Sequence, residues 1–345
     1  MLSMEQTMIA GVEVSRFGLG TWAIGGSEWG AVSEADAIAT MIGAVERGIN
    51  LIDTAPIYGR GRSEELLGKA IREHGRREDF YIATKAGLDW SGDGVVANSR
   101  PKRLREEIEA SLRRLGVEWI DLYQVHWPDT VTPIEETATE LAKFVEEGKV
   151  RALGVSNFSV KQMEEFGRVA KVVSNQPPFN IFEREIERAH GNDEAVLPWC
   201  KKNGVAVLTY SSLCRSLLAG RVKRGMKFEA RDVRSVDPKF IEPRFGQYMD
   251  AVERIGEFAR EHYGKTVLEF AARWVLDRPG VSVALWGAKR PEQLDAITGV
   301  MGWRVEQDAM EEIDRIVGEC VTDPVGPEYL TPGALQTADA SGTVI

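Results

Sequence analysis

Eight short apolar runs, each separated from the next by a longer amphipathic stretch, constrain most strongly how this 345-residue chain can fold. Some runs, such as residues 205–208, show no polar alternation, which is typical of parallel strands covered on both faces. The predicted strands are residues 17–20, 49–53, 80–84, 119–125, 150–155, 172–176, 205–209 and 281–286. Eight parallel strands separated by helices close naturally into a barrel. The sequence therefore predicts an α/β fold of the (β/α)8, or TIM, barrel class.

The amphipathic stretches between the runs carry the signals of helix ends. The expected helices are residues 33–47, 63–74, 101–115, 133–147, 160–169, 193–203 and 247–262, followed by extra C-terminal helices. Ser33 and Ser63 suit the starts of helices, and Gly116 suits a left-handed helix end that turns directly into a strand. Residues 8–14 predict a β-hairpin that plugs the N-terminal mouth of the barrel. We expect one domain over residues 1–345, with an irregular tail over about 324–345.

Composition narrows the classes of partner and the cellular compartment. The net charge of −10 and the pI of about 5.2 disfavour binding to nucleic acid or to an anionic membrane. The three cysteines lie far apart, which suits a reducing compartment, and no run of apolar residues is long enough to span a membrane. The N-terminus has no signal-peptide pattern, and the four histidines have no metal-site spacing. We expect a cytoplasmic protein without a metal ion. The sequence leaves its oligomeric state open.

Four reactive side chains fall at or just after the ends of three predicted strands, where such barrels carry their chemistry. Asp53 ends the second strand and Tyr58 follows it, Lys85 ends the third strand, and His126 follows the fourth. Each of them alone is equally compatible with a structural role. Together they suit hydride transfer to a carbonyl, because the developing alkoxide needs a proton. An ammonium beside a phenol favours the phenolate, and a carboxylate keeps the ammonium charged. We expect Tyr58 to be the acid in reduction and, as phenolate, the base in oxidation.

These residues and the motifs around them resemble the aldo-keto reductase family. The motifs D-T-A-x-x-Y-G, T-K, Y-Q-V-H-W-P, G-V-S-N-F and S-N-Q-P stand in the family's order, and the resemblance extends from residue 18 to residue 293. The pattern is of the bacterial type, related to sugar and aldehyde reductases and to the branch resembling potassium-channel β-subunits. The resemblance implies that Tyr58 donates the proton, that Lys85 and Asp53 tune it, and that His126 orients the carbonyl.

The resemblance also implies a nicotinamide cofactor. The amides of Asn157 and Gln176 can donate and accept hydrogen bonds to a carboxamide, and the ring of Tyr210 can stack on the nicotinamide. Lys289 and Arg290 would bind a 2′-phosphate, which favours NADP(H). NAD(H) stays possible, because Trp286 replaces the family's usual proline and residues 295–297 lack its usual polar pair. The expected cofactor residues are Gly20, Thr21, Trp22, Asp53, Ser156, Asn157, Gln176, Tyr210, Ser211, Ser212, Leu213, Arg215, Gly287, Ala288, Lys289, Arg290 and Gln293.

Aromatic residues near the same strand ends predict the substrate pocket. Its expected residues are Trp22, Trp29, Tyr58, Trp90, His126 and Trp127. Such a pocket suits a sugar, an aryl aldehyde or an apolar ketone equally well. The loop over residues 213–247 and the segment near Tyr329 are expected to close over the site.

Two other functions fit the same residues. The barrel could serve as an NADPH-sensing regulatory subunit, as in the channel-associated branch. Alternatively, Lys85 could act as the nucleophile of a Schiff-base aldolase.

Overall fold

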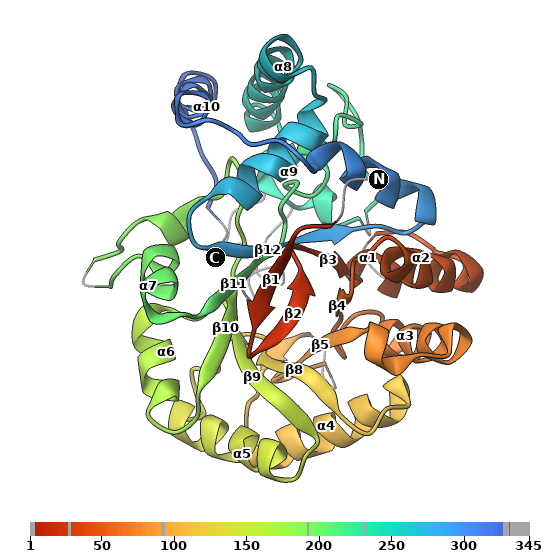
Figure 1. Ribbon diagram of the computed structural model, residues 1–345. Coiled ribbons are helices and arrows are strands. Elements are labelled where there is room, and N and C mark those ends of the chain that lie inside the picture. The colour runs from red at the N-terminus through yellow and green to blue at the C-terminus, as the bar shows by residue number, and fades with distance from the viewer. Residues whose placement is uncertain are drawn as a thin grey trace.

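Eight parallel strands close into a barrel at the centre of the molecule (Figure 1). The computed structural model describes residues 4–26, 29–90, 94–191, 193–230, 232–326 and 331. Around the barrel the strands follow the order β10-β11-β12-β3-β4-β5-β8-β9. Their bounds are β3 (Phe17–Gly20), β4 (Leu51–Asp53), β5 (Tyr81–Ala86), β8 (Ile120–Val125), β9 (Val150–Ser156), β10 (Val172–Gln176), β11 (Ala206–Thr209) and β12 (Val281–Gly287). The predicted barrel is confirmed, and each of the eight strands overlaps the run that predicted it.

Helices form a ring outside the strands (Figure 1). The ring contains α2 (Glu34–Glu46), α3 (Arg62–His74), α4 (Pro101–Leu115), α5 (Ile134–Glu146), α6 (Val160–Gly167), α7 (Val196–Asn203) and α9 (Val267–Asp277). Two further helices, α8 (Arg244–Tyr263) and α10 (Gln307–Cys320), pack against each other beyond this ring. The chain thus places two helices, α8 and α9, between β11 and β12, where the sequence predicted the bounds of only one.

Shorter elements fill the loops of the barrel. In the part of the chain that the structure describes, they are the helix α1 (Trp22–Gly25), the hairpin of β6 (Leu88–Asp89) and β7 (Val96–Ala97), and six 3-10 segments. The 3-10 segments are η1 (Arg77–Asp79), η2 (Glu185–Glu187), η3 (Leu217–Ala219), η4 (Val233–Ser235), η5 (Pro238–Phe240) and η6 (Pro291–Val300). The predicted extra C-terminal helices are therefore η6 and α10.

A β-hairpin closes one end of the barrel, as predicted. It consists of β1 (Gln6–Ile9) and β2 (Val12–Ser15), and Figure 1 shows it crossing the barrel in front of the strands. Ile9 and Val14 are fully buried and belong to the same apolar cluster as the side chains inside the barrel. The remaining open end is the C-terminal end of the strands.

Side chains along each barrel strand alternate between the interior and the helices, as the strand period of two requires. On β5, Tyr81 and Ala83 belong to the interior cluster, whereas Ile82 packs in the outer core beneath the helices. By the same alternation, the side chain of Thr84 points outward and the side chain of Lys85 points into the barrel. The apolar interior thus ends, at the open mouth, in a layer of polar side chains.

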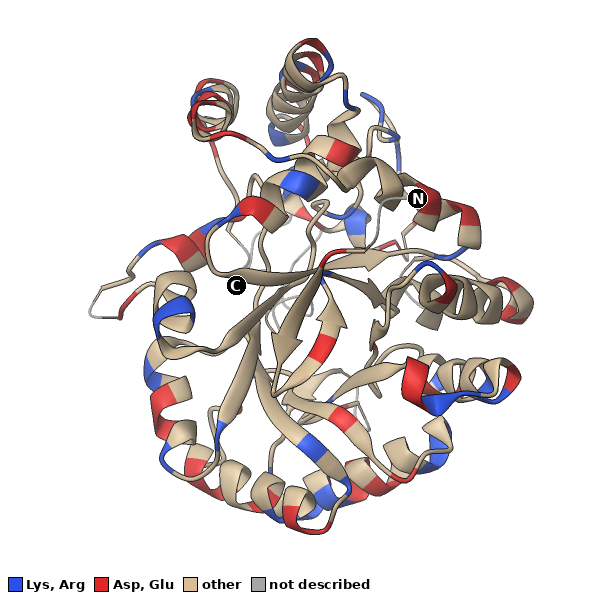
Figure 2. Ribbon diagram, in the orientation of Figure 1, with Lys and Arg blue, Asp and Glu red and all other residues tan. Residues whose placement is uncertain are grey.

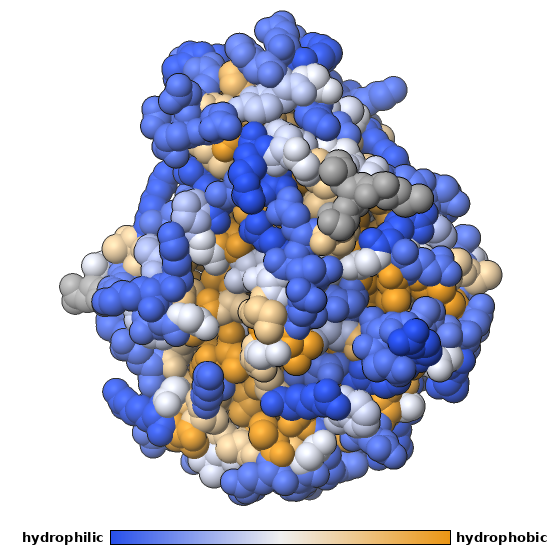
Figure 3. Space-filling model, in the orientation of Figure 1, coloured by the Kyte–Doolittle hydropathy of each residue, from blue (hydrophilic) through white to orange (hydrophobic). Residues whose placement is uncertain are grey.

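Most charged residues lie on the outer helices, and few lie on the barrel strands (Figure 2). Figure 3 shows apolar side chains around the hairpin on this face, with hydrophilic residues over the surrounding helices. Within the described ranges, no helix is both long and apolar enough to cross a membrane. The same ranges contain no cluster of three or more His, Cys, Asp or Glu side chains arranged for a metal ion.

Candidate active site

Lys85 is the centre of the polar layer at the open mouth. Its ammonium donates to Oδ1 of Asp53 at 2.6 Å, to the carbonyl oxygen of Thr54 at 2.9 Å and to Oη of Tyr58 at 3.3 Å. The ring of His126 meets the Tyr58 ring edge-on, with centroids 5.9 Å apart. The structure therefore brings together all four residues that the sequence proposed as catalytic.

Strand register explains why these residues meet. Gly20 on β3 stands level with Asp53 on β4 and with Gly287 on β12, so three strand ends lie in one row. On the other side, Lys85 of β5 pairs with Gln124 of β8. Because the strands are parallel, their carboxyl ends open on the same rim.

Two glycines set the position of Tyr58. A Cβ atom on Gly25 would lie 2.7 Å from the carbonyl carbon of Tyr58 and 2.8 Å from the nitrogen of Gly59. Gly59 itself has a φ of 62° and packs against the backbone of Gly25 in return. The loop after β4 therefore lies backbone to backbone on α1, which explains the glycine in the motif D-T-A-x-x-Y-G.

Two amides hold the carboxylate of Asp53 opposite Lys85. Nε2 of Gln176 donates to Oδ2 of Asp53 at 2.7 Å, and Nε2 of Gln124 approaches the same oxygen at 3.4 Å. Burial lowers the pKa of Lys85, and the charge and hydrogen bond of Asp53 oppose that effect. The Lys85 ammonium is thus dehydrated, and the carboxylate of Asp53 is the main group that stabilises its charge.

The surroundings of His126 favour its neutral form. Burial, followed by the positive charge of Lys85, holds the pKa of His126 well below its usual range. Its backbone carbonyl accepts a hydrogen bond from Nδ2 of Asn157 at 3.0 Å, which ties the loop after β8 to the end of β9. A neutral imidazole can donate one hydrogen bond to a substrate oxygen.

The predicted nicotinamide residues lie next to the four catalytic candidates. Oγ of Ser156 donates to the carbonyl of Gln176 at 2.6 Å, and Oη of Tyr210 donates to Oδ1 of Asn157 at 2.9 Å. Asn157 has a φ of 61°, a left-handed conformation that asparagine adopts more readily than most residues. These four residues form one hydrogen-bonded group at the ends of β9, β10 and β11.

The turn after β11 is the predicted pyrophosphate segment. Cys214, Arg215 and Ser216 have φ values of 46°, 50° and 70°, so three consecutive non-glycine residues are left-handed. The buried guanidinium of Arg215 pairs with Asp237 at 2.8 Å and lies 5.9 Å from the ring of Trp22. Asp237 also pairs with Lys239, so buried ion pairs hold this strained turn to the loop that follows it.

Lys289 and Arg290 lie in the loop after β12. Arg234 is a third cation beside them, and it was not predicted from the sequence. The Lys289 ammonium donates to the carbonyl oxygen of Trp29 at 2.6 Å, and the guanidinium of Arg234 lies over the same Trp29 ring at 5.4 Å. Burial, then the charges of Arg234 and Arg290, lower the pKa of Lys289. Oε1 of Gln293 accepts from the backbone nitrogens of Lys289 and Arg290 and so shapes the loop. Ala288 is buried beneath it.

The predicted pocket residues divide into two groups. The Trp22 ring stacks on Tyr58, with centroids 6.3 Å apart, and meets Trp29 edge-on at 5.4 Å. Trp90 instead lies beneath the guanidinium of Arg103 at 5.2 Å, and Trp127 follows His126 in the loop after β8. The place of Trp90 and Trp127 in the pocket stays a prediction. Tyr329 lies outside the described residues.

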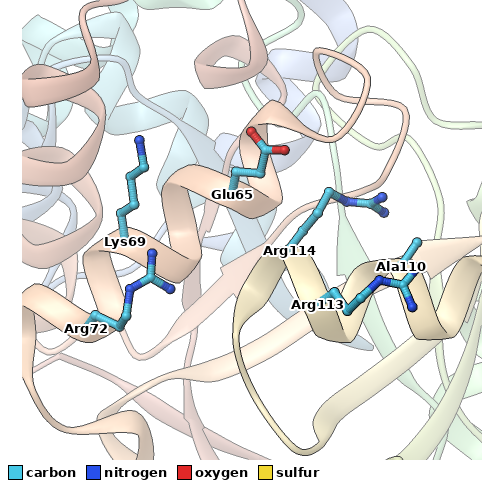
Figure 4. A pocket seen from close by; sticks show the side chains of 6 residues that line it. All are labelled: Glu65, Lys69, Arg72, Ala110, Arg113 and Arg114. Carbon is cyan, nitrogen blue, oxygen red and sulfur yellow. The ribbon is translucent and has the colours of Figure 1, made fainter.

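A groove of about 390 Å³ on the outside of the barrel contains none of the predicted site residues (Figure 4). It lies between α3 and α4 and is lined by Glu65, Lys69, Arg72, Ala110, Arg113 and Arg114. Arg72, Arg113 and Arg114 stand in the last turns of these helices, where cations stabilise the helix dipole. The ends of the two helices therefore explain the charge of this groove.

Comparisons with known proteins show which sequences this chain is similar to. A sequence model described as "Aldo/keto reductase family" matches residues 16–317. The chain is 48% identical over 331 residues to aldo-keto reductase YhdN of Bacillus subtilis (strain 168), covering 95% of this chain and 98% of the relative. It is 34% identical over 298 residues to the NADH-specific methylglyoxal reductase of Escherichia coli (strain K12), covering 82% and 88%.

A solved structure shares the fold at similar identity. The glycerol dehydrogenase AKR11B4 from Gluconobacter oxydans superimposes with a TM-score of 0.84 at 45% identity, covering 93% of this chain and 98% of that one. Together with the family match and the residues at the barrel mouth, this likeness supports one conclusion. The chain belongs to the aldo/keto reductase family, whose members are oxidoreductases that act on carbonyl or alcohol groups with a nicotinamide cofactor.

Proposed function

We propose that the protein is an NADP(H)-dependent reductase of aldehydes and ketones, with Tyr58 as the proton donor. The observation that carries this proposal is the hydrogen bond from Lys85 to Oη of Tyr58 at 3.3 Å. An ammonium has only donors, so the phenol oxygen must accept this bond and the phenol proton points elsewhere. The same contact stabilises the negative charge that Tyr58 acquires when it releases its proton.

The cofactor supplies the hydride, and the residues of the chain fit its parts. Asn157 and Gln176 offer amides for the carboxamide, Tyr210 offers a ring, and the left-handed turn after β11 presents backbone N–H groups for a pyrophosphate. Lys289, Arg290 and Arg234, together with the Asp232 carboxylate that pairs with Arg234, form a group of net positive charge suited to a 2′-phosphate. This cationic group supports NADP(H), although one relative is described as NADH-specific.

The residues of the chain have separate tasks around the substrate. The neutral imidazole of His126 donates to the carbonyl oxygen and orients it toward Tyr58. Tyr58 delivers its proton to that oxygen as negative charge develops there, which limits the cost of forming an alkoxide. Asp53 keeps Lys85 charged throughout, because it is buried beside the ammonium at 2.6 Å. The Lys85 ammonium donates to Asp53, Thr54 and Tyr58, which favours its role as a charged partner of Tyr58 over Schiff-base chemistry.

Relatives suggest substrates for the first assays. One is described as a methylglyoxal reductase and another as a glycerol dehydrogenase, so short aldehydes and polyols are suitable candidates. The stacked Trp22 and Tyr58 rings also offer an apolar wall, for which 4-nitrobenzaldehyde is a convenient probe.

The proposal is tested by a steady-state assay of the natural protein and of Tyr58→Phe, with NADPH and with NADH. We expect Tyr58→Phe to lose about a hundredfold or more of the reduction rate, while NADPH still quenches the tryptophan fluorescence. Tyr81→Phe is the matched control. This tyrosine lies inside the same barrel, and among the described residues its hydroxyl has no hydrogen-bond partner.

Two outcomes would contradict the proposal. Full activity in Tyr58→Phe would remove the assigned proton donor. Tight NADPH binding without turnover of any carbonyl or alcohol would instead favour the regulatory, cofactor-sensing function.

A further inference from the structure

The first turn of α3 docks on the outside of the barrel, directly behind the catalytic residues. Oγ of Ser63 donates to Oγ1 of Thr21 at 2.7 Å and accepts from Oγ1 of Thr54 at 2.9 Å. The next residue, Glu64, accepts from Oγ1 of Thr84 at 2.7 Å. Two consecutive residues of one helix therefore hold the ends of β3, β4 and β5 from behind.

Glu64 is a fully buried carboxylate with one cationic partner among the described ion pairs. That partner is Arg114 of α4, whose guanidinium lies 2.6 Å from Oε2 of Glu64. Figure 4 shows Arg114 beside the outer groove, so the positive end of this pair is the one nearer to solvent. A Cβ atom on Gly68 would lie 2.6 Å from the carbonyl oxygens of Arg114 and Leu115, so glycine is needed for the helices to approach this closely.

Thr84 connects Glu64 to the catalytic lysine. Thr84 and Lys85 are neighbours on β5, and their side chains leave opposite faces of the strand. Thr84 points outward to Glu64, and Lys85 points inward to Asp53. Burial lowers the pKa of Lys85, and the charges of Asp53 and then Glu64 both raise it. Two carboxylates therefore act on Lys85. Asp53 lies inside the barrel, and Glu64 lies on the outer side of β5.

We propose that Glu64 is a positioning residue for the reaction, because it fixes the end of β5 through Thr84 and places a second negative charge behind Lys85. This inference rests on the proposed function, since it assumes that Lys85 and Tyr58 act in proton transfer. A purely structural ion pair between α3 and α4 would have the same contacts. The test therefore needs a readout that responds to charge near Lys85.

The readout is the alkaline limb of the pH profile of kcat/KM for aldehyde reduction with NADPH. Glu64→Gln keeps an acceptor for Thr84 but removes the charge. Loss of a nearby negative charge favours deprotonation of both Tyr58 and Lys85. We expect the limb to move to lower pH by about half a unit to one unit.

Glu107→Gln is the matched control. Glu107 is also a buried carboxylate behind the end of β5, bonded to Arg103 and to the backbone nitrogen of Gly87. Among the described residues it has no hydrogen bond to Thr84, and the charges that raise the pKa of Lys85 are those of Asp53 and Glu64, so Glu107→Gln should move the alkaline limb less than Glu64→Gln does. A Glu64→Gln profile that moves no further than the Glu107→Gln profile would overturn the proposal, whatever happens to stability.

If Glu64→Gln does not fold, a second variant tests the positioning role of Glu64. Arg114→Gln removes the cation that offsets the charge of Glu64, so the limb should move in the opposite direction, to higher pH. An unchanged limb would also overturn the proposal. Full activity of Tyr58→Phe would instead refute the proposed function itself, so the two failures can be told apart.

Discussion

The ammonium of Lys85 lies 2.6 Å from a carboxylate oxygen of Asp53, and neither side chain is more than 2% exposed. Two charges removed from water in this way are stable only while both are present. Asp53→Ala should therefore destabilise the fold by about 3–5 kcal/mol, as measured by urea unfolding. The double variant Asp53→Asn with Lys85→Met should unfold at higher urea than Asp53→Ala, because no charge is then left unpaired. A double variant no more stable than Asp53→Ala would contradict this account.

The cationic group at the β12 loop predicts a difference between the two cofactors. Lys289→Ala combined with Arg290→Ala should raise the KM for NADPH about tenfold or more, because charge-assisted hydrogen bonds to the 2′-phosphate are lost. The KM for NADH should change much less. Arg254→Ala combined with Arg315→Ala, on the outer helices α8 and α10, removes the same net charge and serves as the control. Equal effects of the double variant on both cofactors would remove the argument for a 2′-phosphate site.

The buried carboxyl group of Glu107 predicts how the folding stability of the protein depends on pH. Burial raises the pKa of Glu107 to about 7, with its hydrogen bond from Gly87 and the charge of Arg103 opposing the shift. The folded protein thus keeps a proton between pH 4.5 and 7 that the unfolded chain releases, so folding stability falls as the pH rises through this window. Glu107→Gln cannot ionise. Its melting temperature relative to the natural protein should therefore be higher at pH 8 than at pH 5, and a constant difference would refute the mechanism.

The contact between Gly25 and the Tyr58 loop predicts an effect on activity. Gly25→Ala adds a Cβ atom 2.7 Å from the backbone of Tyr58, so the loop must shift. A displacement of about 1 Å in a catalytic group can cost about a hundredfold in rate, and kcat/KM should fall accordingly. Gly318→Ala in α10 is the control, because no atom lies within 4 Å of its added Cβ. Wild-type kcat/KM in Gly25→Ala would show that the close packing does not position Tyr58.

The barrel and the four catalytic candidates could be predicted because their signals are local. Each strand is a short apolar run, and Asp53, Lys85 and His126 stand at or next to the ends of such runs. Strand register then brings them together without further information.

Other features depend on contacts between distant parts of the chain. Ser63 has the type and position of a helix cap, yet α3 begins at Arg62 and the hydroxyl of Ser63 is buried against Thr21 and Thr54. Arg234 lies 55 positions before Lys289, and only the folded loop after β11 brings the two cations together. Gln124 was not predicted as a site residue, because it stands within a buried strand and no local signal indicates that its amide faces Asp53.

The docking of Ser63 and Glu64 on three strand ends limits which loops at the barrel mouth can change in length. The stretch from Asp53 to Ser63 is anchored at both ends, so an inserted or deleted residue there would displace Tyr58. Within the described ranges, the loops after β5 and β8 have no hydrogen bond or ion pair to α3, and the turn after β11 is held by its own buried ion pairs. We therefore expect new substrate preferences to be acquired most easily through the loops after β5 and β8, while the length of the segment carrying the proton donor stays fixed.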